Sequence, residues 1–216
     1  MQTYKTKVRG QRGFTLLELL IVIAIIAILS VILIIVINPA ETLKKSRDAQ
    51  RISDLNTLKT AMGIYTTSTT SPVIGTNCAA SGVIGGSTNI YYSTASGANP
   101  TSGSPAGGTR AQVAAANLTK VDGSGWIPVA FSTLTGGAPI ASLPIDPVNT
   151  ASASATSTDL VYRYVCNSDN TYELAATLES STYTTGSTNK LTNAPYYQVG
   201  TNMSLFPTSG AHSVDY

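Results

Sequence analysis

The residue types that most enzymes use for catalysis or metal binding are scarce in this chain of 216 residues. It has one histidine, His212, and two cysteines, Cys78 and Cys166. Structural zinc sites draw on several Cys and His residues, and nucleophilic triads need a histidine beside a Ser or Cys. Neither kind of site can be assigned here. The composition therefore argues against an enzyme, and we expect no cofactor.

The side chain that most needs a chemical explanation is Glu18, the only charged residue in the apolar segment 14–37. A carboxylate in such a segment costs about 2.5 to 3.5 kcal/mol on membrane insertion scales and is usually retained for a partner. Cleavage after Gly13 would create a cationic amine on Phe14, which a neighbouring copy, shifted along a shared axis, could offer to Glu18. The alternative is a carboxylate in the headgroup layer, stabilised by the macrodipole at the helix N-terminus. Position alone leaves both interpretations open.

Segment 14–37 has the length and composition of a membrane-spanning helix. Its only polar side chains besides Glu18 are Thr15 and Ser30. A helix of these 24 residues is roughly 36 Å long, and the hydrocarbon core of a bilayer is about 30 Å thick. A helix buried in a soluble protein would need a large core on every side, which the polar remainder of the chain does not supply.

The charges are few and unevenly placed. The formal net charge is +2, with 11% of residues charged, which argues against a nucleic-acid binder held by phosphate contacts. Lys5, Lys7, Arg9 and Arg12 precede the apolar segment. Four more cations follow it within residues 44–51, so the positive-inside rule does not fix the orientation. The two cysteines and the Ser/Thr-rich remainder favour a C-terminal part outside the cytoplasm.

An amphipathic helix is predicted after Pro39. Charged residues between 44 and 59 occupy its polar faces, and the helical pattern ends near Thr66. Pro39 predicts either one kinked rod or two helices that meet there. The apolar positions recur at spacings of three and four, namely Ala49, Ile52, Leu55, Leu58, Met62 and Tyr65.

The remainder of the chain has the pattern of a small β-rich domain. Two alternating segments, 160–166 and 171–178, are separated by polar turn residues, which predicts a hairpin. We therefore expect an α+β fold in which a small antiparallel sheet packs on the apolar stripe of the 40–65 helix. Weaker strand signals lie at 89–93, 126–131 and 196–199.

The segment RGFTLLELLIVIAIIAIL, which begins at Arg12, resembles the class III signal of type IV pilins and type II secretion pseudopilins. The resemblance rests on the basic leader, the Gly13–Phe14 junction, Glu18 and the apolar run. It implies that a prepilin peptidase cleaves between Gly13 and Phe14 and that the Phe14 amine is then methylated. It further implies that Glu18 pairs with Phe14 of an adjacent subunit in a homo-oligomeric helical filament. An assembly ATPase and a membrane platform protein would be further partners.

These features divide the chain into four segments. Residues 1–13 are the cleaved leader, 14–39 the transmembrane and filament-core helix, 40–66 the amphipathic helix that continues it, and 67–216 a loop-rich β globular domain. The expected function is a structural subunit of a pilus-like filament, first a single-pass precursor in the cytoplasmic membrane and later extracellular. The alternatives are a type II secretion pseudopilin and a minor pilin or tip adhesin that acts as a binding module.

Two predictions concern the globular part. Outside the cytoplasm two cysteines in one chain are more often paired than free, which predicts a Cys78–Cys166 disulfide, although both could be small buried hydrophobes. Some pseudopilins bind calcium near their last strands. Asp146, Asp159 and Asp169 are the candidate ligands here, but no calcium loop motif surrounds them and no metal site is assigned. Residues 143–147, LPIDP, are similar to a turn that is common in the family, or form an ordinary Asp-Pro turn.

Overall fold

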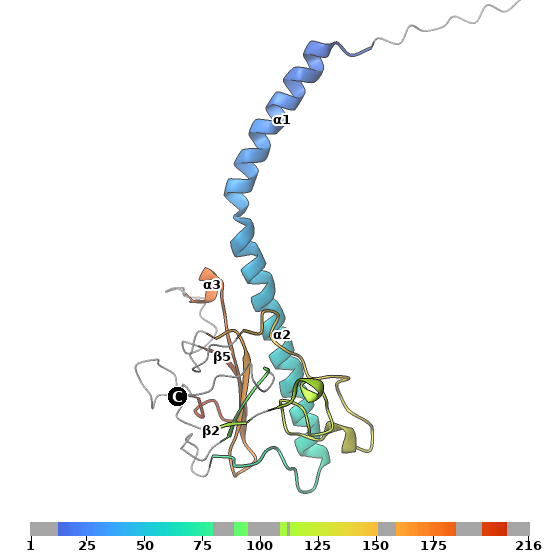
Figure 1. The fold of residues 1–216 in the computed structure, drawn as a ribbon, viewed down its shortest axis with the longest axis vertical. Coiled ribbons are helices and arrows are strands. Elements are labelled where there is room, and N and C mark those ends of the chain that lie inside the picture. Colours follow the sequence, from blue (N-terminus) through green and yellow to red (C-terminus); the bar gives the residue numbers. More distant parts are fainter. Residues whose placement is uncertain are drawn as a thin grey trace, which may run out of the picture. The chain divides into compact units, whose positions relative to one another are not determined.

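A computed structural model describes residues 13–79, 89–94, 109–111, 113–150, 159–184 and 196–206. The chain forms two compact units, Met1–Thr42 and Leu43–Tyr216. The elements in chain order (Figure 1) are α1 Leu16–Ile37, α2 Pro39–Ser68, β1 Asn89–Tyr92, β2 Thr109–Ala111, the 3-10 turns Ala115–Asn117 and Phe131–Thr133, β3 Tyr162–Cys166, β4 Tyr172–Thr177, α3 Ser181–Thr184 and β5 Tyr196–Gly200.

Helix α1 is apolar on every side. Each large apolar side chain that the structure describes in it is exposed, from 48% for Ile21 to 88% for Leu16. The stretch Leu16–Ile34 is long and apolar enough to cross a membrane. Its one hydroxyl beyond the first turn, that of Ser30, donates to the carbonyl of Ile26 at 2.7 Å. The helix therefore satisfies its own polar groups, as a segment in lipid must.

The helical pattern breaks at Asn38. This residue adopts the left-handed conformation with φ of 45°, which Asn tolerates better than most residues. Pro39 then begins α2. The N–H groups of the first helical residues have no partner within the helix, so the missing N–H of Pro39 costs no hydrogen bond there. Of the two arrangements that the sequence allowed at Pro39, the structure shows two helices.

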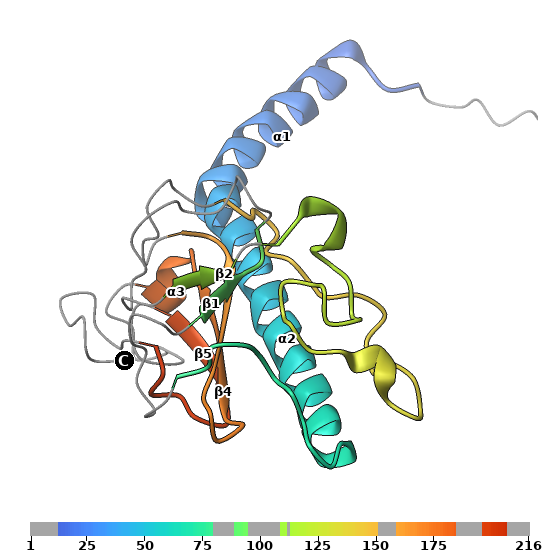
Figure 2. The ribbon, with the colours of Figure 1, turned by 60° about the horizontal axis from the view of Figure 1, so that its bottom comes forward.

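The second half of α2 supplies the core of the globular unit. Leu55, Leu58, Met62 and Tyr65 are buried, as their spacing predicted. In Figures 1 and 2 the sheet lies on one side of α2 and the irregular segment 113–150 on another. The side chains that α2 meets in the core include Trp126, Phe131, Tyr162, Tyr164, Tyr172 and Leu174.

The sheet has the strand order β2-β1-β3-β4-β5. Strands β1, β3, β4 and β5 are antiparallel neighbours, and β2 pairs in parallel with β1. The predicted hairpin is β3–β4, in which Tyr164 lies opposite Leu174. These elements confirm the expected α+β fold with a pilin-like arrangement.

The strand expected at 126–131 is wrong. Trp126, Ile127 and Val129 are fully buried but lie in irregular backbone, and Ala130 makes only an isolated bridge with Asp122. The apolar run reflects burial against α2 and the sheet, which requires no strand. Strand β2 was not expected, because its three residues carry no alternating pattern.

The predicted disulfide is present. Cys78 and Cys166 are joined, with their Cα atoms 4.8 Å apart and their positions separated by 88 in sequence. The bond ties the segment after α2 to the end of β3. A Cβ on Gly75 would collide with the Sγ of Cys166, so the close approach at this bond requires glycine.

Candidate functional site

The Gly13–Phe14 bond lies in exposed, non-helical backbone before α1. Phe14 is 91% exposed, and no heavy atom lies within 4 Å of the position that a Cβ on Gly13 would occupy. Residues 1–12, which hold the cations of the leader, lie outside the described residues. The candidate cleavage bond is thus accessible and does not require a helix to unwind.

Helix α1 begins with a reciprocal cap between Thr15 and Glu18. The hydroxyl of Thr15 accepts the N–H of Glu18 at 3.2 Å. The Oε2 atom of Glu18 accepts both the N–H and the hydroxyl of Thr15, each at 2.9 Å. These bonds satisfy polar groups that the first turn of any helix leaves unpaired.

The cap leaves Phe14 outside the helix and uses one of the two carboxylate oxygens of Glu18. Among the described residues, Glu18 uses Oε2 alone, and its side chain is exposed. Our sequence analysis missed this role of Glu18, although Thr-x-x-Glu at the start of an apolar run is a readable capping signature. One carboxylate can therefore cap its own helix and still offer an oxygen to a cation from outside.

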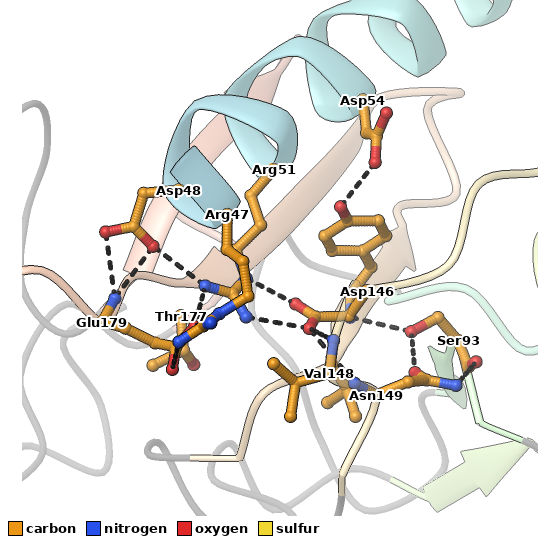
Figure 3. Close-up of polar contacts among 12 residues, drawn as sticks. Arg47, Asp48, Arg51, Asp54, Ser93, Asp146, Val148, Asn149, Thr177 and Glu179 are labelled. Carbon is orange, nitrogen blue, oxygen red and sulfur yellow. Dashed lines mark hydrogen bonds and ion pairs between the residues drawn. The ribbon is translucent and has the colours of Figure 1, made fainter. Parts of the chain in front are cut away.

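A second polar cluster lies within the globular unit, around Arg51 (Figure 3). The guanidinium of Arg51 holds both oxygens of Asp146, with Nε–Oδ2 at 2.7 Å and Nη2–Oδ1 at 2.9 Å. Its Nη1 reaches Asp48 at 2.9 Å and Glu179 at 2.7 Å. The side chains of Arg51, Asp48 and Asp146 are fully buried.

Backbone groups complete this cluster. Asp48 accepts the N–H groups of Glu179 and Ser180, and Asp146 accepts those of Val148 and Asn149. The cluster therefore joins α2 to the 146–149 turn and to the chain just after β4. With its oxygens engaged by donors of the protein in this way, the cluster holds these parts of the fold together.

A second arginine, Arg47, joins the cluster nearer the surface. Arg47 donates to both oxygens of Glu179, at 2.8 and 3.0 Å. The hydrogen bond from Arg47, opposed by burial and supported by Arg51, lowers the pKa of Glu179. Glu179 therefore stays ionised where it bridges the two arginines.

The charged face predicted for α2 is partly wrong. Asp48 and Arg51, which the pattern placed on the polar faces, are fully buried, whereas Ala49 of the predicted apolar stripe is exposed and Ile52 is half-buried. The reason is the cluster itself, because Arg51 turns inward to meet Asp146. No local signal in the sequence identifies that partner.

The three calcium candidates do not converge. Asp146 is committed to Arg51, and Asp169 is exposed in the β3–β4 turn, where it accepts the N–H of Thr171. Asp159 is buried before β3. In the described part of the chain, no group of three or more His, Cys, Asp or Glu residues could hold a metal ion.

A groove of about 560 Å³ lies at the end of α2. It is lined by Ile64, by the hydroxyl residues Ser68, Thr69 and Thr70, and by residues 133–139. None of the lining side chains is charged, so the groove holds no acid, base or metal ligand for catalysis.

An apolar N-terminal helix, a second helix and a sheet with four antiparallel strands and the parallel edge strand β2 together define an α+β protein consistent with the pilin-like fold. Residues 8–34 match the family model of the prokaryotic N-terminal methylation motif. These residues thus carry the class III signal peptide of type IV pilins, a motif that indicates a type IV pilin-like or pseudopilin precursor of the kind that a prepilin peptidase processes. No curated protein and no solved structure matches the chain.

Proposed function

We propose that this chain is a structural subunit of a type IV pilus-like filament. The observation that carries the proposal is α1, an apolar helix whose described side chains are exposed on all sides directly after a processing signal. Such a surface must be covered by lipid or by other apolar helices. The bilayer covers it in the precursor, and neighbouring copies of α1 cover it in the filament.

Processing supplies the charge that assembly needs. A prepilin peptidase cleaves between Gly13 and Phe14, which removes the leader 1–13, and the new amine of Phe14 is methylated. In the filament Glu18 pairs with the Phe14 amine of an adjacent subunit. Two observations support this role: Phe14 lies outside the helical cap, and Glu18 has an oxygen that the cap does not use.

The pairing has a physical reason. Near the headgroups the carboxylate of Glu18 can stay hydrated, but in the apolar core of a filament it loses water. A charge that loses water without a partner is strongly unfavourable, so the neighbour's amine must neutralise it.

The globular domain lies outside the cytoplasm in this proposal, where its disulfide can form and persist. We assign it no catalytic step. By family analogy its partners are copies of itself, the peptidase, an assembly ATPase and a membrane platform protein.

The test separates the two roles of Glu18. Glu18→Gln keeps a side-chain oxygen for the cap and loses the charge, whereas Thr15→Ala weakens the cap by about 0.5 to 2 kcal/mol and keeps the charge. Breaking one side of a buried pair costs about 3 to 5 kcal/mol. We therefore expect Glu18→Gln and Glu18→Ala to reduce filament yield sharply and Thr15→Ala to reduce it slightly.

Filament yield in the sheared extracellular fraction is measured beside the amount of chain in the membrane fraction, which should not fall in any variant. Ser30→Ala is the matched control, because it removes a polar group of the same helix that is bonded within that helix. Wild-type yield from Glu18→Gln, or equal losses from Glu18→Ala and Thr15→Ala, would show that Glu18 acts only as a cap.

A further inference from the structure

The four cations that follow the apolar helix are not equivalent. Arg47 pairs with Glu179 at 2.8 Å, and Arg51 is fully buried among carboxylates. Lys44 and Lys45 form no ion pair within the part of the chain that the structure describes. Two of the four positive charges are therefore used inside the globular unit, and two are available to a partner outside it.

The position of these lysines in the chain keeps them close to the end of the membrane span. Lys45 follows Ile37, the last residue of α1, by eight residues. At about 3.5 Å per residue, Lys45 lies within roughly 28 Å of that end in any conformation, and a helical path shortens this to about 12 Å. The headgroup layer is about 5 to 8 Å deep, and a lysine stem extends the reach of its ammonium.

Leu43, which precedes Lys44 and Lys45, adds an apolar side chain. Leu43 is 61% exposed at the start of the globular unit. An exposed leucine beside two lysines suits a bilayer surface, where the leucine meets the acyl boundary and the ammonium groups meet phosphate. A helix that crosses the headgroup layer is surrounded by headgroups, so these side chains need not share one face. Within residues 39–46, Glu41 opposes the two lysines, which leaves a net charge of +1.

We propose that Lys44 and Lys45 bind the headgroup phosphates of anionic phospholipids at the surface of the membrane that α1 spans. The contact fixes the depth of the precursor and is released when the chain leaves the membrane. The proposal rests on the membrane span of the proposed function but not on filament assembly.

The experiment measures the reactivity of individual lysines in the full-length chain. The protein is placed in nanodiscs of phosphatidylcholine, with or without phosphatidylglycerol, and acetylated with an amine-specific ester, and each lysine is quantified by mass spectrometry. Lys59 is the internal control, because it is exposed on the same helix, about 21 Å beyond Lys45.

We expect acetylation of Lys44 and Lys45 to be about fivefold slower in the anionic discs than in the neutral discs. Salt at about 1 M, where the Debye length is about 3 Å, should abolish the difference. The rate at Lys59 should be the same in both discs.

Equal rates at Lys44 and Lys45 in the two kinds of disc would overturn the proposal, and so would equal slowing at Lys59, which would indicate a general effect of the charged surface. Protection by inorganic phosphate in neutral discs would assign the lysines to a free anion and overturn the membrane assignment. Co-elution of chain and disc is recorded separately. Its failure would refute the span, and with it both this proposal and the proposed function.

Discussion

Replacing Arg51 with methionine should destabilise the globular unit much more than replacing Arg47. Among the residues that the structure describes, Arg51 is the only cation that contacts Asp146. Both side chains are fully buried. Breaking a buried pair costs about 3 to 5 kcal/mol, because the remaining carboxylates lose their cation. Asp48 and Asp146 each keep two backbone N–H donors, so we expect the lower end, about 3 kcal/mol.

Trp126 provides the assay. It is the only tryptophan in the sequence and is fully buried in the globular unit. Its fluorescence therefore reports urea or thermal unfolding of that unit in the full chain held in detergent micelles. A loss of about 3 kcal/mol corresponds to a fall in melting temperature of roughly 6 to 12 °C for a unit of this size.

Arg47→Met is the matched control. The Arg47 side chain is 32% exposed, so water screens its pair with Glu179, and its loss should destabilise the unit far less than the loss of the fully buried Arg51. Arg51→Lys keeps the charge but cannot hold both oxygens of Asp146, so its stability should lie between those of wild type and Arg51→Met. Equal effects of Arg51→Met and Arg47→Met would refute the idea that buried charge in this cluster stabilises the unit.

Two further predictions concern Glu173 of β4 and Gly75 beside the disulfide. Burial raises the pKa of Glu173 from 4.5 to about 8, so the folded unit favours its protonated form and stability should fall as pH rises from about 4.5 through about 8. Glu173→Gln should flatten that fall in urea midpoints taken from pH 5 to 9, and parallel wild-type and variant curves would contradict it. Gly75→Ala should lower the fraction of disulfide-linked protein in non-reducing peptide maps, because the new Cβ meets the Sγ of Cys166. Gly136→Ala, where the space is open, should leave that fraction unchanged, and equal fractions in the two variants would count against the steric argument.

The features that depend on local pattern could be predicted from the sequence. The uninterrupted apolar run of α1, the spacing of three and four between the buried positions from Leu55 to Tyr65, and the alternating segments of the β3–β4 hairpin can each be read within one stretch of sequence. The Thr15–Glu18 cap was also readable, because both partners lie within one helical turn.

The features that depend on distant partners could not be predicted. Arg51 lies 95 residues from Asp146 and 128 from Glu179, so no spacing rule indicates that its charge is buried. The segment around Trp126 has the composition of a strand, because composition reflects burial and does not specify the backbone that carries it. The spacing of apolar residues likewise predicted that Ala49 is buried. In the structure Ala49 is exposed, and the cluster around Arg51 buries Asp48 instead.

Intact mass and N-terminal sequencing of the protein in sheared extracellular filaments test the proposed function most directly. We expect a chain that begins at Phe14, carries one added methyl group on its terminal amine and contains the Cys78–Cys166 bond. A chain in assembled filaments that retains residues before Phe14, or the absence of this chain from the filament fraction while it accumulates in the membrane, would contradict the proposal.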